Sequence, residues 1–71
     1  MTEKIDTESF KELARLRELR VTHSDLDYLI DQLSHDPMVD QLRIRRLKKR
    51  KLMIKDMITR LESELIPDMD A

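Results

Sequence analysis

The chain contains no Cys, Gly or Trp, and only two Pro, one Phe and one Tyr among its 71 residues. Without Cys there is no disulfide framework, no Cys-ligated zinc and no thiol chemistry. Without Gly there is no glycine-rich loop of the kind that holds phosphate groups. A chain of this length forms one small domain, which is too small for the deep cleft that most enzymes use. We therefore expect no enzyme activity, no cofactor and no small-molecule substrate.

Long apolar runs are also missing, because the longest contains three residues, as in residues 52–54. A helix that spans a bilayer needs about 20 apolar residues, so the sequence predicts no membrane segment. Residues 1–20 alternate charged with single apolar positions, which is unlike the continuous apolar core of a signal peptide. The expected location is the cytoplasm.

Charged residues are abundant, at 41% of the chain, but their net charge of −1 hides an uneven distribution. Residues 1–42 carry ten acidic and five basic side chains. Residues 43–55, the basic block, carry eight basic side chains and no acidic one. Residues 56–71 carry five acidic side chains and one basic. This segregation is the most informative electrostatic feature of the sequence.

Apolar residues recur at alternating spacings of three and four in two stretches, which is the heptad pattern of helices that pack side by side. The first seam is Leu16, Leu19, His23, Leu26, Ile30 and Leu33; the second is Ile44, Leu47, Lys51, Ile54, Ile58, Leu61 and Leu65. Each seam has one polar member, His23 in the first and Lys51 in the second. Helix-favouring Leu, Arg, Lys, Glu and Met fill much of the rest, so the sequence predicts two long amphipathic helices.

Between the seams lies the segment Ser34-His35-Asp36-Pro37. Proline disfavours helical geometry at the preceding residue and suits the first position of a new helix. The sequence therefore predicts a helix over about 7–34, a turn at 34–37, a second helix over about 37–65 with Asp36 as its cap, and a frayed end at 67–71. Because so short a connection makes the helices antiparallel neighbours, the predicted fold is a single all-α, coiled-coil-like two-helix hairpin over 1–71.

A turn centred near residue 35 also predicts the register of the two helices. Residue numbers of facing positions should add to about 70, so that Leu26 faces Ile44. Near the open end of the hairpin, Phe10 and Leu13 lie off the first seam. We expect these two side chains to fold over the second helix at residues 58–61.

Apolar residues outside the seams suggest that the hairpin does not stay alone, because a single hairpin buries only one stripe per helix. The predicted apolar strip consists of Leu29, Val39, Leu42, Met53 and Met57. Burying each such side chain is worth about 1.5–3 kcal/mol, and leaving them in water favours association. We expect self-association, most simply two hairpins in a four-helix bundle. The alternative is a monomer with scattered surface Met and Leu.

Three patterns together resemble a known family. They are HSDLDYLI at residues 23–30, Asp36-Pro37 followed by Asp40, and LKKRKLMIKDMI at residues 47–58. This combination is similar to the YdcH-like small bacterial proteins, a family of unknown function, over about residues 13–61. Ile54 stands where that family often has Leu, and residues 1–12 lie outside the pattern. The resemblance implies an α-helical hairpin in a bacterial cytosol and brings no activity with it.

The basic block has two interpretations. Its cations either pair with first-helix acids such as Asp25 and Asp27, which would serve solubility and register, or they contact a polyanion. In the second case Arg45, Arg46 and Lys49, which point away from the partner helix, would carry a sequence-nonspecific contact with nucleic acid. The scarcity of aromatic residues for base stacking favours the first interpretation.

His23, Asp27, Asp31 and His35 follow one another at intervals of four. A straight helix turns by about 40° at each such step, so the first and fourth side chains diverge and no metal site is expected. His23 instead reads as a polar core position, hydrogen-bonded to Asp27 or across the interface, that fixes register. Its reference pKa near 6.5 would make association sensitive to pH.

Lys51 is the polar member of the second seam. Its aliphatic stem can lie along the seam while the ammonium group reaches sideways, toward Glu18 or Asp56. The alternative is that Lys51 selects the partner. Asp56 and Arg60 are four residues apart and are predicted to pair on the helix surface.

The sequence thus predicts a non-enzymatic interaction or adaptor module that self-associates and lays its apolar strip against another helix, a mode that suits adaptable Met side chains. The alternative function is a sequence-nonspecific nucleic-acid-associated factor that uses the basic block at 43–55. The two functions differ in their response to salt, because polyanion binding weakens steeply as salt is added and apolar docking does not.

Overall fold

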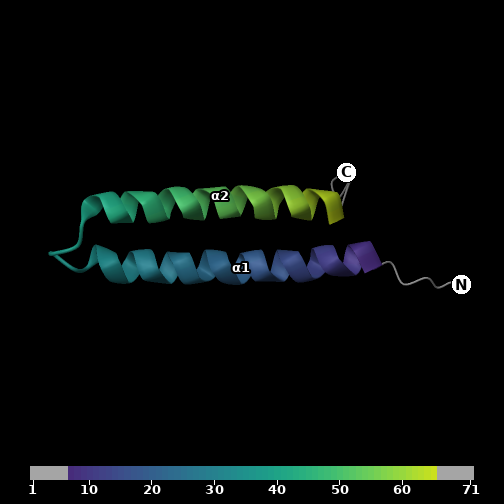
Figure 1. Cartoon of the computed structure of the whole chain (residues 1–71), viewed down its shortest axis with the longest axis horizontal. Helices are drawn as coiled ribbons and strands as arrows, with labels where there is room; N and C mark the ends of the chain where they lie inside the picture. Colours follow the sequence, from purple (N-terminus) through teal and green to yellow (C-terminus); the bar gives the residue numbers. More distant parts are fainter. Residues whose placement is uncertain (1–6, 66–71) are drawn as a thin grey trace, which may run out of the picture.

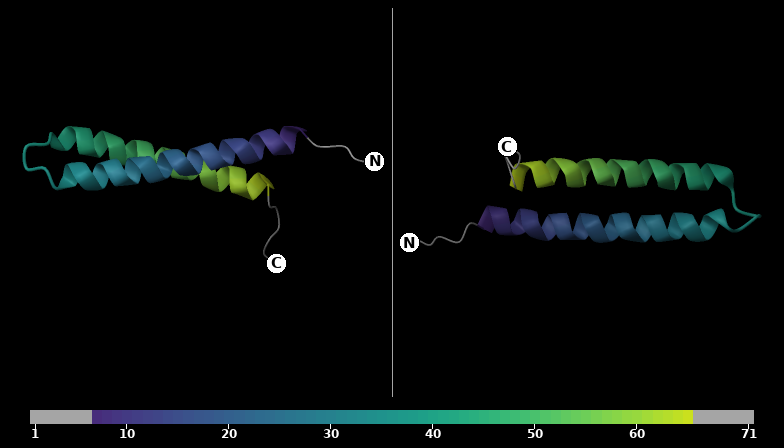
Figure 2. Two further views of the ribbon diagram at one scale, coloured as in Figure 1. Left: turned by 90° about the horizontal axis from the view of Figure 1, so that it is seen from below. Right: turned by 180° about the vertical axis from the view of Figure 1, so that it is seen from behind.

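A computed structural model of the chain describes residues 7–65, which form a two-helix hairpin (Figure 1). Helix α1 spans Thr7–Ser34 and helix α2 spans Gln41–Leu65. The helices run antiparallel side by side, are joined by residues 35–40, and cross when the hairpin is viewed edge-on (Figure 2). Residues 7–65 contain no strand. The predicted all-α antiparallel hairpin is confirmed.

The hairpin is a single layer of two helices that lie side by side (Figure 1). Each helix with its side chains is about 10–12 Å thick. No further element of the described part covers either broad face of this layer. Side chains that do not face the other helix therefore border solvent.

Apolar packing between α1 and α2 follows the two predicted seams. The buried core residues are Leu16, Leu26, Ile30, Ile44 and Ile58. The other seam residues, including His23 and Lys51, are half-buried, so each position of both seams faces inward at least in part. The heptad prediction of the core is therefore confirmed.

The turn between the helices is longer than the sequence predicts, because α2 begins at Gln41 and not at Pro37. Residues 36–39 form a separate tight turn in which the Asp36 carbonyl accepts a hydrogen bond from Val39 N–H at 3.1 Å. The Asp36 carboxylate accepts a second hydrogen bond, from Met38 N–H at 2.9 Å. Aspartate at the first position and proline at the second are the preferred residues of such a turn. Asp36 therefore caps this turn, and its predicted role as the cap of the second helix is wrong.

Asp40 directly precedes α2 and caps its first turn. Its carboxylate accepts a hydrogen bond from Leu42 N–H at 2.9 Å, and its carbonyl accepts from Arg43 N–H at 3.0 Å. These bonds satisfy backbone groups that a helix start otherwise leaves unpaired, and the negative charge suits the positive end of the helix dipole. The two aspartates thus serve two successive turns.

The end of α1 is closed by polar side chains. Ser34 Oγ donates a hydrogen bond to the Ile30 carbonyl at 2.7 Å, and His35 Nδ1 lies 2.7 Å from the carbonyl oxygen of Asp31. Both contacts satisfy carbonyl groups of the last helical turn. His35 therefore closes the helix, and its ring is turned back onto α1.

The longer connection shifts the register of the hairpin. Residue numbers of the ion-paired positions add to 78 for Asp27 and Lys51 and to 82 for Arg20 and Glu62. The predicted value of about 70 is wrong, because a six-residue connection displaces α2 along α1. Each residue of α1 consequently faces a position several residues further along α2 than expected.

This shift leaves the start of α1 beyond the described end of α2 (Figure 1). Phe10 is 69% exposed and Leu13 is 54% exposed. The prediction that they fold over residues 58–61 is wrong, because that part of α2 lies opposite Leu19. Phe10 and Leu13 instead border a shallow surface pocket together with Ala14 and Arg17, all on α1.

The core predicts a specific ranking of substitutions. Ile58→Ala removes a side chain that is 5% exposed and should destabilise the hairpin by about 2–5 kcal/mol. Met38→Ala truncates a side chain that is 87% exposed and should change stability by less than about 0.5 kcal/mol. Urea unfolding followed by circular dichroism measures both. Equal losses in the two variants would contradict the described core.

Candidate functional site

The hairpin presents two long flanks, one on each side of the seams. The first, the ion-pair flank, carries two bridges between α1 and α2. Lys51 Nζ donates a hydrogen bond to Asp27 Oδ1 at 2.8 Å, and Arg20 pairs with Glu62. Because heptad positions repeat every seven residues, Lys55 and Lys48 share the direction of Glu62 and lie on this flank.

Lys51 is half-buried, with its stem in the seam and its ammonium group on Asp27. The predicted geometry of this side chain is confirmed, but the predicted partners Glu18 and Asp56 are wrong because the register differs. Asp56 pairs instead with Arg60 at 3.0 Å, as the spacing of four residues predicts. The Asp27–Lys51 bridge links the two helices near their middle.

Asp27 is the acid whose ionisation responds to this bridge. The hydrogen bond and positive charge of Lys51 lower the pKa of Asp27 below its ordinary value, and the nearby His23 lowers it further. A carboxyl whose pKa is lowered by folding stabilises the fold in its charged form. The bridge is solvent-exposed, so its contribution is modest and screened by salt.

His23 is half-buried in the first seam, as predicted. Within residues 7–65 its ring forms no hydrogen bond, so the predicted bond to Asp27 or across the helix pair is not present. The reason is that Asp27 turns its carboxylate to Lys51. The predicted dependence of association on His23 stays a prediction.

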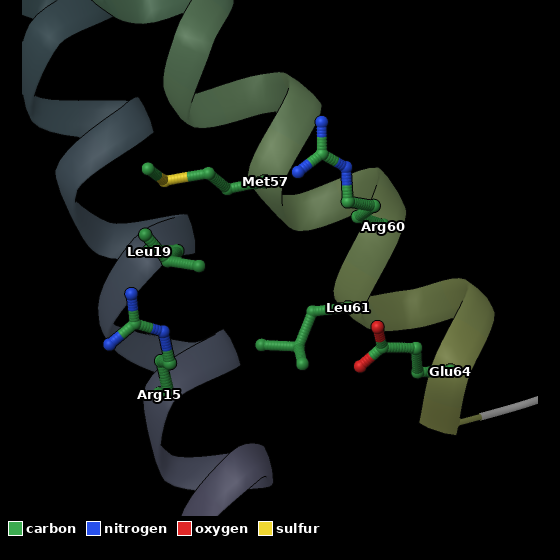
Figure 3. Close-up of a pocket in the computed structure, with 6 residues that line it drawn as sticks. All are labelled: Arg15, Leu19, Met57, Arg60, Leu61 and Glu64. Carbon is green, nitrogen blue, oxygen red and sulfur yellow. The ribbon is translucent and has the colours of Figure 1, made fainter.

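The second flank, the methionine flank, is apolar at its centre. Met57, Leu19 and Leu61 converge there from both helices (Figure 3). They form the floor of an open groove of about 260 Å³ whose rim carries Arg15, Arg60 and Glu64. A groove of this size is smaller than the roughly 300–1,000 Å³ of sites for drug-sized ligands. Its shape suits a side chain from another helix.

Most of the predicted apolar strip is exposed, as expected: Leu29, Leu42, Met53 and Met57. Leu29 lies on the methionine flank of α1, since it follows Arg15 by two heptads. Met53 precedes Met57 by one turn of α2, and Leu42 precedes Met53 by three turns. Val39 is the exception, because it is half-buried in the connecting turn and lies apart from the strip.

The basic block makes only one ion pair with α1. Of its eight cations, Lys51 is bridged to Asp27. The other seven are exposed and form no ion pair with any residue in the range 7–65: Arg43, Arg45, Arg46, Lys48, Lys49, Arg50 and Lys55. The interpretation that first-helix acids neutralise the block is therefore wrong apart from this single pair.

Two sets of surface residues escape sequence reasoning. The first set is the charged rim of the groove. The sequence does contain a sign of it, because Arg50 and Glu64 lie one heptad before and after Met57 and therefore share its side of α2. The pocket around Phe10 and Arg17 is the other. It arises from the displaced register, for which the sequence offers only the spacing of the two aspartates in the turn.

Nowhere in residues 7–65 do three or more His, Asp or Glu side chains come close enough together to hold a metal ion. Neither α1 nor α2 has the length and apolar character needed to cross a membrane.

A comparison with protein families matches residues 16–62 to the family described as "Protein of unknown function (DUF465)". The chain belongs to the DUF465 family. YdcH is a member of this family, so the resemblance drawn from the sequence is confirmed. The DUF465 match includes both seams almost entirely, the connecting turn and the whole basic block. The comparison with curated proteins gives no match, and the comparison with solved structures gives none either.

The Asp27–Lys51 bridge predicts how the DUF465 hairpin responds to acid. Because folding lowers the pKa of Asp27, the bridge stabilises the fold above the unfolded value of about 3.9, and this stabilisation is lost as pH falls through the folded value. Asp27→Asn should be less stable than wild type at pH 7, and the difference should vanish near pH 2. Urea midpoints across pH measure this.

Asp25→Asn is the matched control, since Asp25 forms no ion pair among the described residues. Its midpoint should follow that of the wild type at both pH values. A loss as large as that of Asp27→Asn would show that general charge, and not the bridge, determines acid sensitivity.

Proposed function

We propose that this DUF465 protein is a non-enzymatic helical interaction module that self-associates through its methionine flank. The observation that carries the proposal is the exposed apolar strip on a hairpin only one helix thick. Met57 is 39% exposed and Met53 is 55% exposed, and the groove at Met57 is open. Water on such a surface is released when a second apolar surface covers it.

The size of the flank supports a second copy of the chain as the occupant. Helix α2 contains 25 residues and is therefore about 37 Å long. A face of that length and about 20 Å in width offers roughly 700–800 Å² per hairpin, which is the area that each partner contributes to a standard stable interface. Two hairpins packed in this way form a four-helix bundle.

Charge on the methionine flank favours one orientation of the two copies. Arg43 and Arg50 lie toward the turn, and Glu64 lies at the open end, all in heptad register with Met57. A head-to-tail twofold pairing places the arginines of each copy near the glutamate of the other. A head-to-head pairing brings the arginines together, which costs energy.

Because methionine lies at the centre of the strip, the proposal includes helices of other proteins as partners. Its unbranched, polarisable side chain adapts to differently shaped surfaces. An amphipathic helix of another protein can dock where the second copy does. Self-association is the form of the proposal that purified protein tests directly.

The expected result is a concentration-dependent dimer that is lost in Leu42→Gln/Met53→Gln/Met57→Gln. Gln retains helix propensity, so the triple variant should stay helical while its sedimentation coefficient stays that of a monomer at all concentrations. Sedimentation velocity and circular dichroism measure the two properties.

The matched control is Val21→Gln/Tyr28→Gln/Leu52→Gln, which also replaces three exposed apolar side chains. These positions lie off the strip, so the control should dimerise like the wild type. A wild-type chain that sediments as a monomer at every concentration would refute the proposal. A dimer that the control disrupts and the strip variant does not would refute it as well.

A further inference from the structure

The seven unpaired cations of the basic block form a dense positive surface on α2. Arg43 and Lys55 are twelve residues apart, which is about 18 Å along a helix. Seven charges over this length give about one charge per 2.6 Å, which approaches the one per 1.7 Å that double-stranded DNA carries along its axis. Such a concentration of like charge repels itself unless an anion is close.

Among the residues that the structure describes, no acidic side chain of α1 forms an ion pair with these seven cations. Asp27 is engaged with Lys51, and the carboxylates of Asp36 and Asp40 accept hydrogen bonds from backbone amides in the turn. In the described structure the seven cations thus have no anionic side chain paired with them.

The chemistry of the side chains indicates which anion fits. Four of the seven are arginines, Arg43, Arg45, Arg46 and Arg50. The guanidinium group binds phosphate oxygens through two parallel hydrogen bonds and loses little hydration in doing so. The cations also lie on three sides of α2, since Arg50 flanks the seam on one side, Lys48 on the other, and Lys49 points outward. A surface of that shape reaches phosphates on either side of a helix.

The lack of aromatic residues in the block indicates whether a bound phosphate polymer would be recognised by its bases or by its backbone. Residues 43–55 contain no Phe, Tyr or Trp, so no base can stack there. Contacts with phosphate position a protein without reading sequence. An acidic peptide fits less well, because an acidic amphipathic helix needs apolar anchors and residues 48–51 are four consecutive cations.

From these observations we infer that the unpaired cations of α2, centred on Arg45, Arg46 and Lys49, form a sequence-independent binding surface for the phosphate backbone of double-stranded nucleic acid. Lys48 and Lys55 lie on the flank opposite the methionine flank, and Arg45 lies off the methionine flank. Arg46 and Lys49 border the strip, one heptad from Met53 and from Leu42 respectively. The cations of the opposite flank therefore remain open in a dimer of hairpins, and this binding goes beyond the proposed self-association.

The test uses a fluorescent DNA duplex of about 20 base pairs of mixed sequence and the full chain, with binding followed by anisotropy. Log affinity should fall linearly with log salt, with a slope of about −0.9 for each phosphate contacted. Arg45→Gln/Arg46→Gln/Lys49→Gln should reduce the magnitude of that slope by about 2–3 and weaken binding at low salt. The single variant Lys49→Gln should reduce it by about 0.9.

The matched control is Lys4→Gln/Lys11→Gln/Arg17→Gln, which removes two Lys and one Arg from outside the basic block. It should keep the wild-type slope, and circular dichroism should show both triple variants folded. A duplex of unrelated sequence should bind with the same affinity as the first.

Four results would overturn the inference. They are no binding at about 100 µM protein, the weak end of nonspecific affinity; an affinity independent of salt; an equal loss in the two triple variants, which would indicate net charge alone; and tighter binding of poly-glutamate than of the duplex. The last result would indicate an acidic protein as the partner.

Discussion

Two heptad seams that pack against each other are the interaction on which the rest of the molecule depends. Each seam buries one stripe of its helix, and within residues 7–65 the buried core consists of five apolar side chains. A third layer is missing from the described part, so the apolar side chains outside the seams border water. The fold is thereby fixed by its core, while the same geometry leaves the methionine flank uncovered. The core packing and the proposed self-association follow from one constraint.

Charge is arranged around this packing in a consistent way. The two acids of the turn, Asp36 and Asp40, accept hydrogen bonds from backbone amides and each cap a turn. One lysine of the basic block crosses to α1 and joins the helices, and the remaining seven cations stay at the surface of α2. The small net charge of the chain therefore conceals a strongly positive segment on α2.

The helices and their core follow from the sequence because the period of three and four residues depends only on local geometry. The register does not, because it depends on the path of six connecting residues. Pro37 fits both the first turn of a helix and the second position of a tight turn, and the spacing of Asp36 and Asp40 is the one local signal that separates them. The partner of Lys51 and the exposure of Phe10 depend on that choice. The apolar strip can be predicted from the sequence because apolar residues that are not assigned to a seam are expected to be exposed. The lack of ion pairs for the seven cations cannot be predicted in this way, because it depends on which residues of α1 and α2 face each other.

The register is tested most directly by distances between spin labels, which are easily placed because the chain has no Cys of its own. One label is attached at Val21→Cys and the second at either Lys49→Cys or Asp56→Cys, all exposed positions that point away from the helix pair. Labelled chains are diluted in unlabelled ones so that only distances within a hairpin are recorded. In the described register residue 21 lies about 5 Å along the axis from residue 56 and about 15 Å from residue 49, so the account predicts a shorter distance to position 56. A shorter distance to position 49 would contradict it, and so would the long separations of an unbroken helix.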